Sequence, residues 1–184
     1  RILLESTGER YLPRADTGAR DERALLADFA KRRGLEPEWV FVETFDELFP
    51  ALEAGEGDVI AAALTVTKSR RERAAFTWAI QSVEEVLIGR RGAQSLPKTR
   101  ADLAGREVHV RPDSSFAESL EALRAEGVDV KIVPAPEALD PEALVHEVTR
   151  GLRPLTVVDS HLLAAIQTYN PDAVALFPIA EGRE

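Results

Sequence analysis

The sequence predicts an α/β fold with largely parallel sheets, divided into two lobes. Short runs of β-branched and apolar residues, such as WVFV at 39–42, alternate along the chain with segments of helical periodicity. Many of these runs are apolar throughout, which is typical of strands buried on both faces. The polar stretch GRRGAQSLPKTR at 89–100 contains Gly and Pro and is the best candidate for a linker between two lobes.

The strand candidates are short and follow one another at intervals that leave room for helices. In chain order they are 2–4, 39–42, 59–63, 83–88, 108–110, 130–133, 156–158 and 173–177.

The helices are predicted from their first turns. Four segments place a hydroxyl three residues before an acid, a spacing that lets both side chains satisfy free amides at a helix start. Asp140 before Pro141 indicates another start, with proline at the first helical position, and Asp159 with Ser160 precedes the apolar run HLLAAIQTY. The four hydroxyl–acid pairs are Thr44 with Glu47, Ser69 with Glu72, Thr99 with Asp102, and Ser115 with Glu118.

Composition excludes several function classes. The chain has 184 residues, is 45% hydrophobic and carries a net charge of −9, which argues against a nucleic-acid binder or a protein that binds an anionic membrane surface. It has no cysteine, and its three histidines, His109, His146 and His161, show no metal-ligand spacing, so we expect no metal and no cofactor. No apolar run is long enough for a membrane span. The absence of methionine suggests a processed or excised product, so a missing signal or anchor says little about the parent protein.

Polar groups gather at three strand-to-helix junctions, where ligands of open α/β sheets bind. Arg70 beside Thr65 would make a carboxylate clamp, because a guanidinium binds a carboxylate through two parallel hydrogen bonds. Ser114 and Ser115 could add hydroxyl and amide donors, and Asp159 suits an ammonium group. Together these groups could bind both ends of an α-amino acid. The alternative is that the hydroxyls and Asp159 only cap helices and that Arg70 is solvated, as we expect for Lys68, Arg71 and Arg73.

The stretch GEGDVIAAALTVTKSRRERAAFT at 55–77 resembles the hallmark of family 3 solute-binding proteins, the periplasmic amino-acid-binding type. The matched positions are Gly55, Asp58, Thr65, Thr67, Arg70, Phe76 and Thr77, and ADLAGR-x-V-x-V recurs at 101–110. The resemblance covers nearly the whole chain and implies a periplasmic-binding-protein-like fold of type II, with a cleft between two lobes. It implies lobe 1 at 1–88, lobe 2 at 89–160, and the start of a return to lobe 1 at 161–184, with the C-terminal part truncated.

Within this family the chain is similar to the N-terminal solute-binding module of membrane-bound lytic transglycosylase F. The similarity rests on LTVTKSRRERAAF, VVDSHLLAAIQ and NPDAVALFPIAE. It implies a non-catalytic, periplasmic ligand sensor that binds an amino acid or a cell-wall-derived peptide (muropeptide) and regulates an attached peptidoglycan lytic transglycosylase domain. The parent would be outer-membrane associated, touching the membrane only through its anchor.

The resemblance also assigns ligand-binding roles by position. It implies that Arg70 and Thr65 hold the ligand α-carboxylate, that Ser114 and Ser115 add contacts from the second lobe, and that Asp159 and the Ala63 carbonyl hold the ammonium. Tyr11 is the one candidate for the first of two aromatics that sandwich the ligand in many members. Ile80 stands where the second of these aromatics is common, with Trp78 two residues away. Before the serines of the second lobe, Asp113 replaces the small residue that is usual in the family.

Two other functions remain open. One is a free substrate-binding receptor of an amino-acid ABC importer, which would have the same fold and pocket. The other is a cyclohexadienyl-dehydratase-like enzyme, which would need a positioned acid and base. Four acids are available, but none has a partner in a motif: Glu22, Glu84, Glu85 and Asp113.

Overall fold

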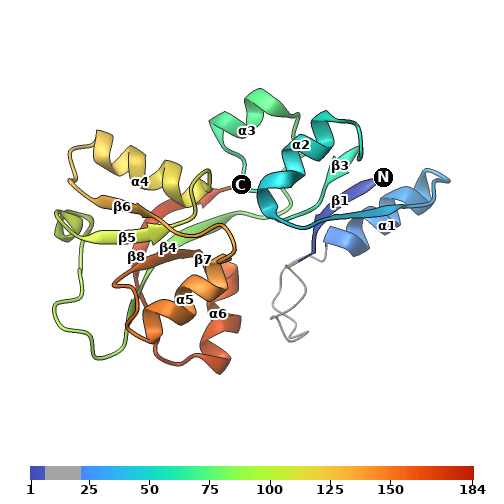
Figure 1. Cartoon of the computed structure of the whole chain (residues 1–184). Coiled ribbons are helices and arrows are strands. Elements are labelled where there is room, and N and C mark those ends of the chain that lie inside the picture. Colours follow the sequence, from blue (N-terminus) through green and yellow to red (C-terminus); the bar gives the residue numbers. More distant parts are fainter. Residues whose placement is uncertain (7–21) are drawn as a thin grey trace. The chain divides into compact units, whose positions relative to one another are not determined.

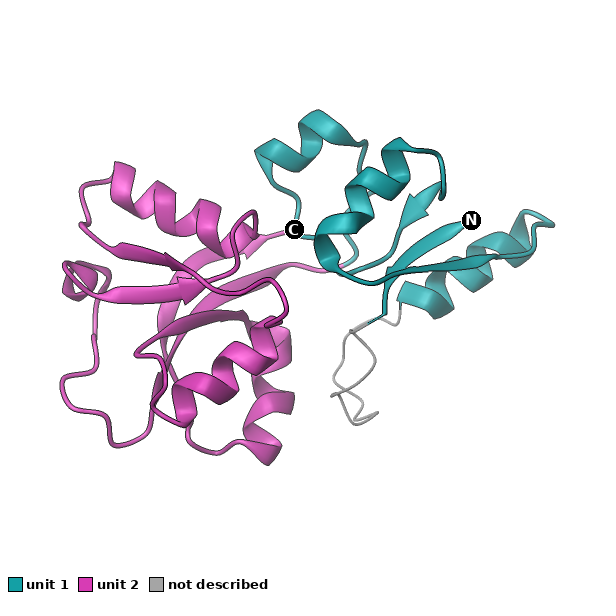
Figure 2. Cartoon of the chain, viewed as in Figure 1, with its two compact units in different colours: residues 1–80 teal, residues 81–184 magenta. Residues whose placement is uncertain are grey.

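The computed structural model describes residues 1–6 and 22–184, and the chain divides into unit 1, residues 1–80, and unit 2, residues 81–184 (Figure 2). Each unit has its own sheet with helices packed on it (Figure 1). In the described part of the chain, no helix is both long enough and apolar enough to cross a membrane.

Unit 1 is built on a parallel sheet of three strands. β1 (Ile2–Glu5) lies in the centre, between β2 (Trp39–Val42) and β3 (Val59–Ile60). Leu3 of β1 pairs with Val40 on one side and Ile60 on the other. The central strand is buried and apolar, as expected for a parallel sheet that is covered on both faces.

Alternation along β1 divides the core of unit 1 between the two faces of its sheet. Leu3 packs with Leu48 and Ala51 of α2 (Leu48–Glu53), which follows the 3-10 turn η2 (Phe45–Glu47). Ile2 and Leu4 point to the opposite face and pack with Leu26 of α1 (Glu22–Arg32). The last helix of the unit is the short α3 (Lys68–Arg73).

Unit 2 contains a mixed sheet. β4 (Val83–Arg90) lies between β7 (Thr156–Asp159) and β8 (Ala173–Arg183), and both pairings are antiparallel. β5 (Glu107–Val110) and β6 (Lys131–Pro134) form a parallel pair. The pair continues the sheet at β7, because the His109 amide donates to the Leu155 carbonyl at 3.0 Å and the Thr156 hydroxyl donates to the His109 carbonyl at 2.8 Å.

The helices of unit 2 cover both faces of this sheet. On one face Leu87 and Val157 pack with Phe116 and Leu120 of α4 (Ser115–Ala125). On the other face Val86 and Val158 pack with α5 (Pro141–Thr149) and α6 (Ser160–Tyr169). A 3-10 turn, η3 (Arg100–Leu103), precedes β5.

The α/β fold expected from the sequence is confirmed, and every predicted strand has a counterpart. β3 is shorter than predicted and β8 longer. The predicted caps at Thr44 and Thr99 are present, since the Glu47 and Asp102 carboxylates accept backbone amides there. Asp140 likewise accepts the Ala143 amide, at 2.7 Å.

Two helix starts were predicted wrongly by one or two residues. α3 is capped by Thr67 rather than Ser69, and α4 by Ser114 rather than Ser115. In both places the chain leaves the extended conformation earlier than the hydroxyl–acid spacing suggests, so the earlier hydroxyl meets the free amide.

The two units divide at a different residue from the predicted lobes. The sequence places the boundary at residue 88 and a return to lobe 1 from residue 161. In the structure the division follows residue 80, and β4, from Val83 onwards, pairs with strands of unit 2 on both of its edges. Residues 161–184, with α6 and β8, belong to unit 2 because β8 pairs along β4.

Candidate functional site

Arg70 of α3 is anchored to the segment that leads into its own helix. One terminal guanidinium nitrogen donates to the Thr65 carbonyl at 2.9 Å, and the Arg70 amide donates to the Thr67 hydroxyl at 3.3 Å. All three residues are buried, with 7% of Arg70 exposed. The structure therefore brings Thr65 and Arg70 together through the Thr65 main-chain carbonyl.

The aromatic ring of Phe45 faces the Arg70 guanidinium, whose carbon lies 5.3 Å from the ring centroid. Phe45 itself packs against the core cluster of Leu3 and Leu48. Burial of a guanidinium costs free energy unless it has partners, and the carbonyl and the ring are two of them. The alternative of a solvated Arg70 is therefore wrong.

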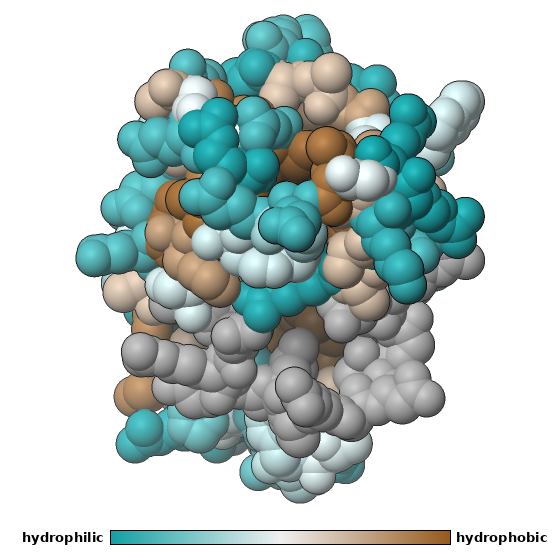
Figure 3. Space-filling model, turned by 90° about the vertical axis from the view of Figure 1, so that its right-hand side faces the viewer, coloured by the Kyte–Doolittle hydropathy of each residue, from teal (hydrophilic) through white to brown (hydrophobic). Residues whose placement is uncertain are grey.

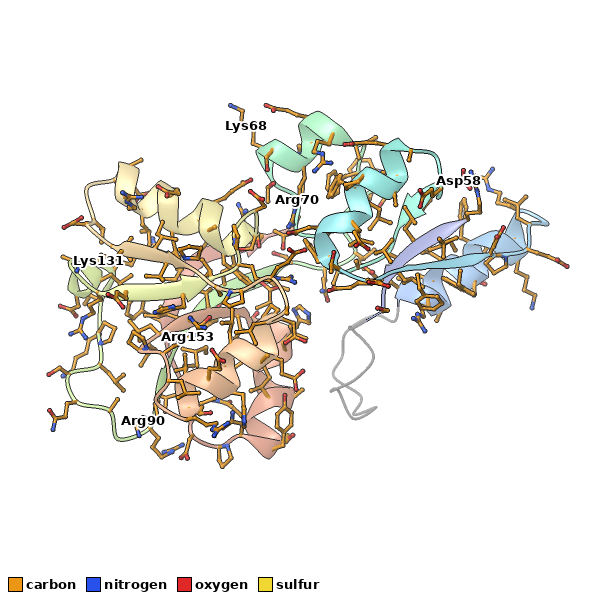
Figure 4. The ribbon with its side chains drawn as sticks, viewed as in Figure 1. Asp58, Lys68, Arg70, Arg90, Lys131 and Arg153 are labelled. Atoms are coloured by element: carbon orange, nitrogen blue, oxygen red, sulfur yellow. The ribbon has the colours of Figure 1, made fainter. Side chains whose placement is uncertain are left out.

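The neighbouring basic residues behave differently from Arg70. Figure 4 shows Lys68 pointing outward from α3, whereas Arg70 lies on the inner side of the helix. Arg71 is exposed. Arg73 is also exposed, but it forms an ion pair with Glu53 at 2.7 Å and lies over the Phe49 ring at 4.7 Å. Its guanidinium is the main reason that the pKa of Glu53 is lowered.

Ala63 lies two residues before Thr65 and has a left-handed backbone, with φ of 47°. Its amide donates to a carboxylate oxygen of Glu22 at 3.0 Å, which joins α1 to this segment. The sequence names Glu22 only as an available acid. Its contact with Ala63 spans 41 positions, so no local pattern announces it.

In unit 2, Ser114 and Ser115 lie where β5 leads into α4. The Ser114 hydroxyl donates to the Arg111 carbonyl at 2.7 Å and accepts the Ala117 amide at 3.2 Å, so this residue is a helix cap as well as a candidate ligand contact. Ser115 is 5% exposed. Asp113, just before them, has a left-handed backbone with φ of 57°.

Asp159 ends β7 and precedes α6, but its side chain does not cap that helix. It stands directly opposite Glu85 in the antiparallel pair, so both carboxylates lie on the same face of the sheet. Glu85 is fully buried, and neither of its oxygens has a hydrogen-bond partner among the described residues. Arg183 of β8 forms an ion pair with Glu85 at 3.5 Å.

The candidate residues thus fall into two groups, one in each unit. Ala63, Thr65 and Arg70 share a single segment of unit 1. Ser114, Ser115 and Asp159 belong to junctions that follow the neighbouring strands β5 and β7 of unit 2. Tyr11 lies outside the described residues.

The described residues contain no group of three or more metal-ligating side chains placed to hold an ion. His109 is engaged by Arg153, one of whose guanidinium nitrogens lies 2.8 Å from Nδ1. A guanidinium can only donate, so the imidazole nitrogen accepts and His109 is neutral. Burial, and then the Arg153 charge, lowers the pKa of His109.

Residues 20–153 match the model of the bacterial extracellular solute-binding proteins, family 3. The chain belongs to this family. Among curated proteins it is 35% identical to the membrane-bound lytic murein transglycosylase F of Desulfosudis oleivorans, over 97% of this chain and 38% of that protein. It is 34% identical to the protein of the same name from Pseudomonas savastanoi pv. phaseolicola, over 100% of this chain and 37% of that protein. This solute-binding chain therefore spans little more than a third of its curated relatives.

Solved structures agree with the family and the fold. The arginine-bound form of truncated ArgBP from T. maritima superposes with a TM-score of 0.74 at 25% identity, covering 100% of this chain and 84% of that one. An ancestral arginine-binding protein bound to arginine gives a TM-score of 0.76 at 22% identity, covering 99% and 80%. The predicted periplasmic-binding-protein-like fold is confirmed.

Proposed function

We propose that this solute-binding chain is the ligand-sensing module of a peptidoglycan lytic transglycosylase. It binds an amino acid or a cell-wall-derived peptide in the periplasm, and the bound ligand regulates an attached catalytic domain. The chain itself performs no catalysis.

The observation that carries the binding function is the buried Arg70. A guanidinium presents several donors in a rigid fork, so Arg70 can donate to Thr65 and also offer a parallel pair of hydrogen bonds to a ligand carboxylate. The Phe45 ring and the Thr65 carbonyl fix its orientation before a ligand arrives. Such preorganisation reduces the entropy lost on binding.

The proposal assigns the remaining ligand contacts to three residues of unit 2, which are Asp159, Ser114 and Ser115. Asp159 would hold the ligand ammonium, with help from the Ala63 carbonyl, and the two serines would add hydroxyl and amide contacts. The ligand class follows from these charges: a free carboxylate with a nearby ammonium is what an α-amino acid and the end of a peptide have in common. The solved neighbours bound to arginine support this class.

The names of the curated relatives support the attachment of this solute-binding chain to a transglycosylase domain. A ligand shifts an equilibrium between two conformations only through its differential affinity for them. The proposal therefore requires that the ligand favour one conformation of the solute-binding chain, to which the catalytic domain responds. The same relatives favour a module over a free importer receptor, since they are named as transglycosylases.

Calorimetric titration with L-arginine and a peptidoglycan stem peptide tests the site. The wild type should bind at least one of them, and Arg70→Ala should lose about 1.5–3 kcal/mol of binding free energy, the value typical of a hydrogen-bonded charged group. Arg71→Ala is the matched control, because it removes the same charge from an exposed neighbour. Equal affinity in the wild type and Arg70→Ala would refute the carboxylate clamp.

Regulation is tested in the full-length parent protein. Peptidoglycan cleavage should change when the ligand is added, and the Arg70→Ala variant should cleave at a rate that the ligand does not alter. Cleavage that responds to the ligand equally in both proteins would exclude this site as the sensor.

A further inference from the structure

Ala63 is held in a conformation that alanine rarely adopts. Left-handed backbone costs a non-glycine residue about 1–2 kcal/mol, and such strain persists only where surrounding contacts enforce it. The contact here is the hydrogen bond from the Ala63 amide to the Glu22 carboxylate, at 3.0 Å. A charged acceptor makes this bond stronger than one between neutral groups.

The short segment from Ala63 to Thr65 is anchored at both ends by charged side chains. Glu22 accepts the amide of Ala63, and Arg70 donates to the carbonyl of Thr65 at 2.9 Å. Both anchors come from helices, α1 and α3, so the segment is fixed between two elements of unit 1. Ala63 itself is exposed.

We propose that Glu22 is a positioning residue for ligand binding. By holding the Ala63 amide, Glu22 keeps the backbone left-handed, which sets the direction of the Ala63 carbonyl for the ligand ammonium. It also keeps the Thr65 carbonyl within hydrogen-bonding distance of Arg70. Glu22 does not touch the ligand. The inference rests on the proposed function, because it assigns a role at the same binding site.

Two substitutions separate positioning from a direct ionic contact. Glu22→Gln keeps a carbonyl oxygen that can accept the Ala63 amide but removes the charge, whereas Glu22→Ala removes the acceptor. Glu36→Gln, at an exposed position of the same unit, is the control for the change in net charge. Each variant is titrated with L-arginine and a peptidoglycan stem peptide, its melting temperature is measured without ligand, and exchange of the Ala63 amide is followed by NMR.

Positioning predicts a specific combination of results. Glu22→Ala should bind at least about tenfold more weakly, as loss of a charge-assisted hydrogen bond implies, with faster Ala63 exchange and a melting temperature close to that of the wild type. Glu22→Gln should keep slow exchange and bind within a few fold of the wild type, as should Glu36→Gln.

Three results would overturn the inference. Wild-type affinity in Glu22→Ala with fast Ala63 exchange would show that the segment need not be held. A loss of affinity in Glu22→Gln as large as in Glu22→Ala, with Ala63 still protected, would show that Glu22 contacts the ligand by its charge. A wild type that binds neither probe would overturn the proposed function and this inference together.

Discussion

Glu85 is the most deeply buried acid among the described residues, and Arg183 forms its ion pair. Removal of one partner from a buried pair leaves an uncompensated charge in a medium that solvates it poorly, and costs about 3–5 kcal/mol. Arg183 is itself only partly buried, with 26% of its side chain exposed. The Nε atom that faces Glu85 is nonetheless buried, so we expect a cost within that range.

We predict that Arg183→Ala lowers the free energy of unfolding in urea, and that adding Glu85→Gln restores most of the loss. The double variant removes the isolated charge while preserving the volume of the side chain. A urea midpoint of Arg183→Ala equal to that of the wild type would show that Glu85 does not depend on this cation.

The sequence predicts several candidate site residues but not the contacts that hold them. Arg70 and Thr65 were found because their spacing is a recognisable local pattern. Phe45, which faces Arg70, and Glu22, which holds Ala63, come from elements distant in the chain. Partners at such separations are set by how helices pack on the sheet, which no local pattern reports.

At the scale of elements, strands were easier to predict than helix starts. Continuous apolar runs identify buried strands directly. Thr67 and Ser69 both carry a hydroxyl, and their hydroxyls lie 3.0 Å apart, so only the backbone conformation decides which one caps α3. This detail concerns the candidate site, since the Arg70 amide is the group that Thr67 caps.

Gly57 allows β1 to lie against the turn before β3. A Cβ atom at Gly57 would come within 2.3 Å of Leu3 Cγ, and Leu3 is fully buried in the core of unit 1. We predict that Gly57→Ala destabilises the protein by about 1–3 kcal/mol, as overpacking does, measured by urea unfolding. In a double-mutant cycle, Leu3→Ala should make the same substitution less costly. Independent, additive effects would contradict this contact.

At the scale of the whole molecule, the composition predicts a surface that carries both polar and apolar residues. Figure 3 shows hydrophobic surface interleaved with hydrophilic surface on the face that it presents. The largest exposed apolar side chain of the described residues is Trp78, which is 95% exposed. Trp78 lies two residues before Ile80, the position at which many members of the family carry the second of two aromatic residues that sandwich the ligand.

Stability should depend on pH through two histidines of unit 2. Burial lowers the pKa of His109 and of His161 below the ordinary value of 6.5. The unfolded chain therefore binds protons first as the pH falls, and stability present above pH 6.5 is lost progressively below it. The carboxylates of Glu107 and Glu147 act to raise the pKa of His109, whereas burial and the Arg153 charge lower it.

We predict that the melting temperature falls between about pH 7 and pH 5, the range in which histidines titrate. His109→Gln should flatten part of this fall, because a neutral amide cannot take up the proton. A melting temperature that stays constant or rises on acidification would contradict the neutral, buried state of these rings.

The central claim is that the solute-binding chain takes a ligand with a free α-carboxylate, and a thermal-shift comparison tests it most directly. The wild type is melted with each standard amino acid, with a peptidoglycan stem peptide, and with the α-carboxamide of each. A ligand that binds only the native state at 100 times its dissociation constant stabilises it by about 2.7 kcal/mol. The account predicts such a shift with at least one free carboxylate and none with the matching amide. No shift with any compound, or equal shifts with acid and amide, would contradict it.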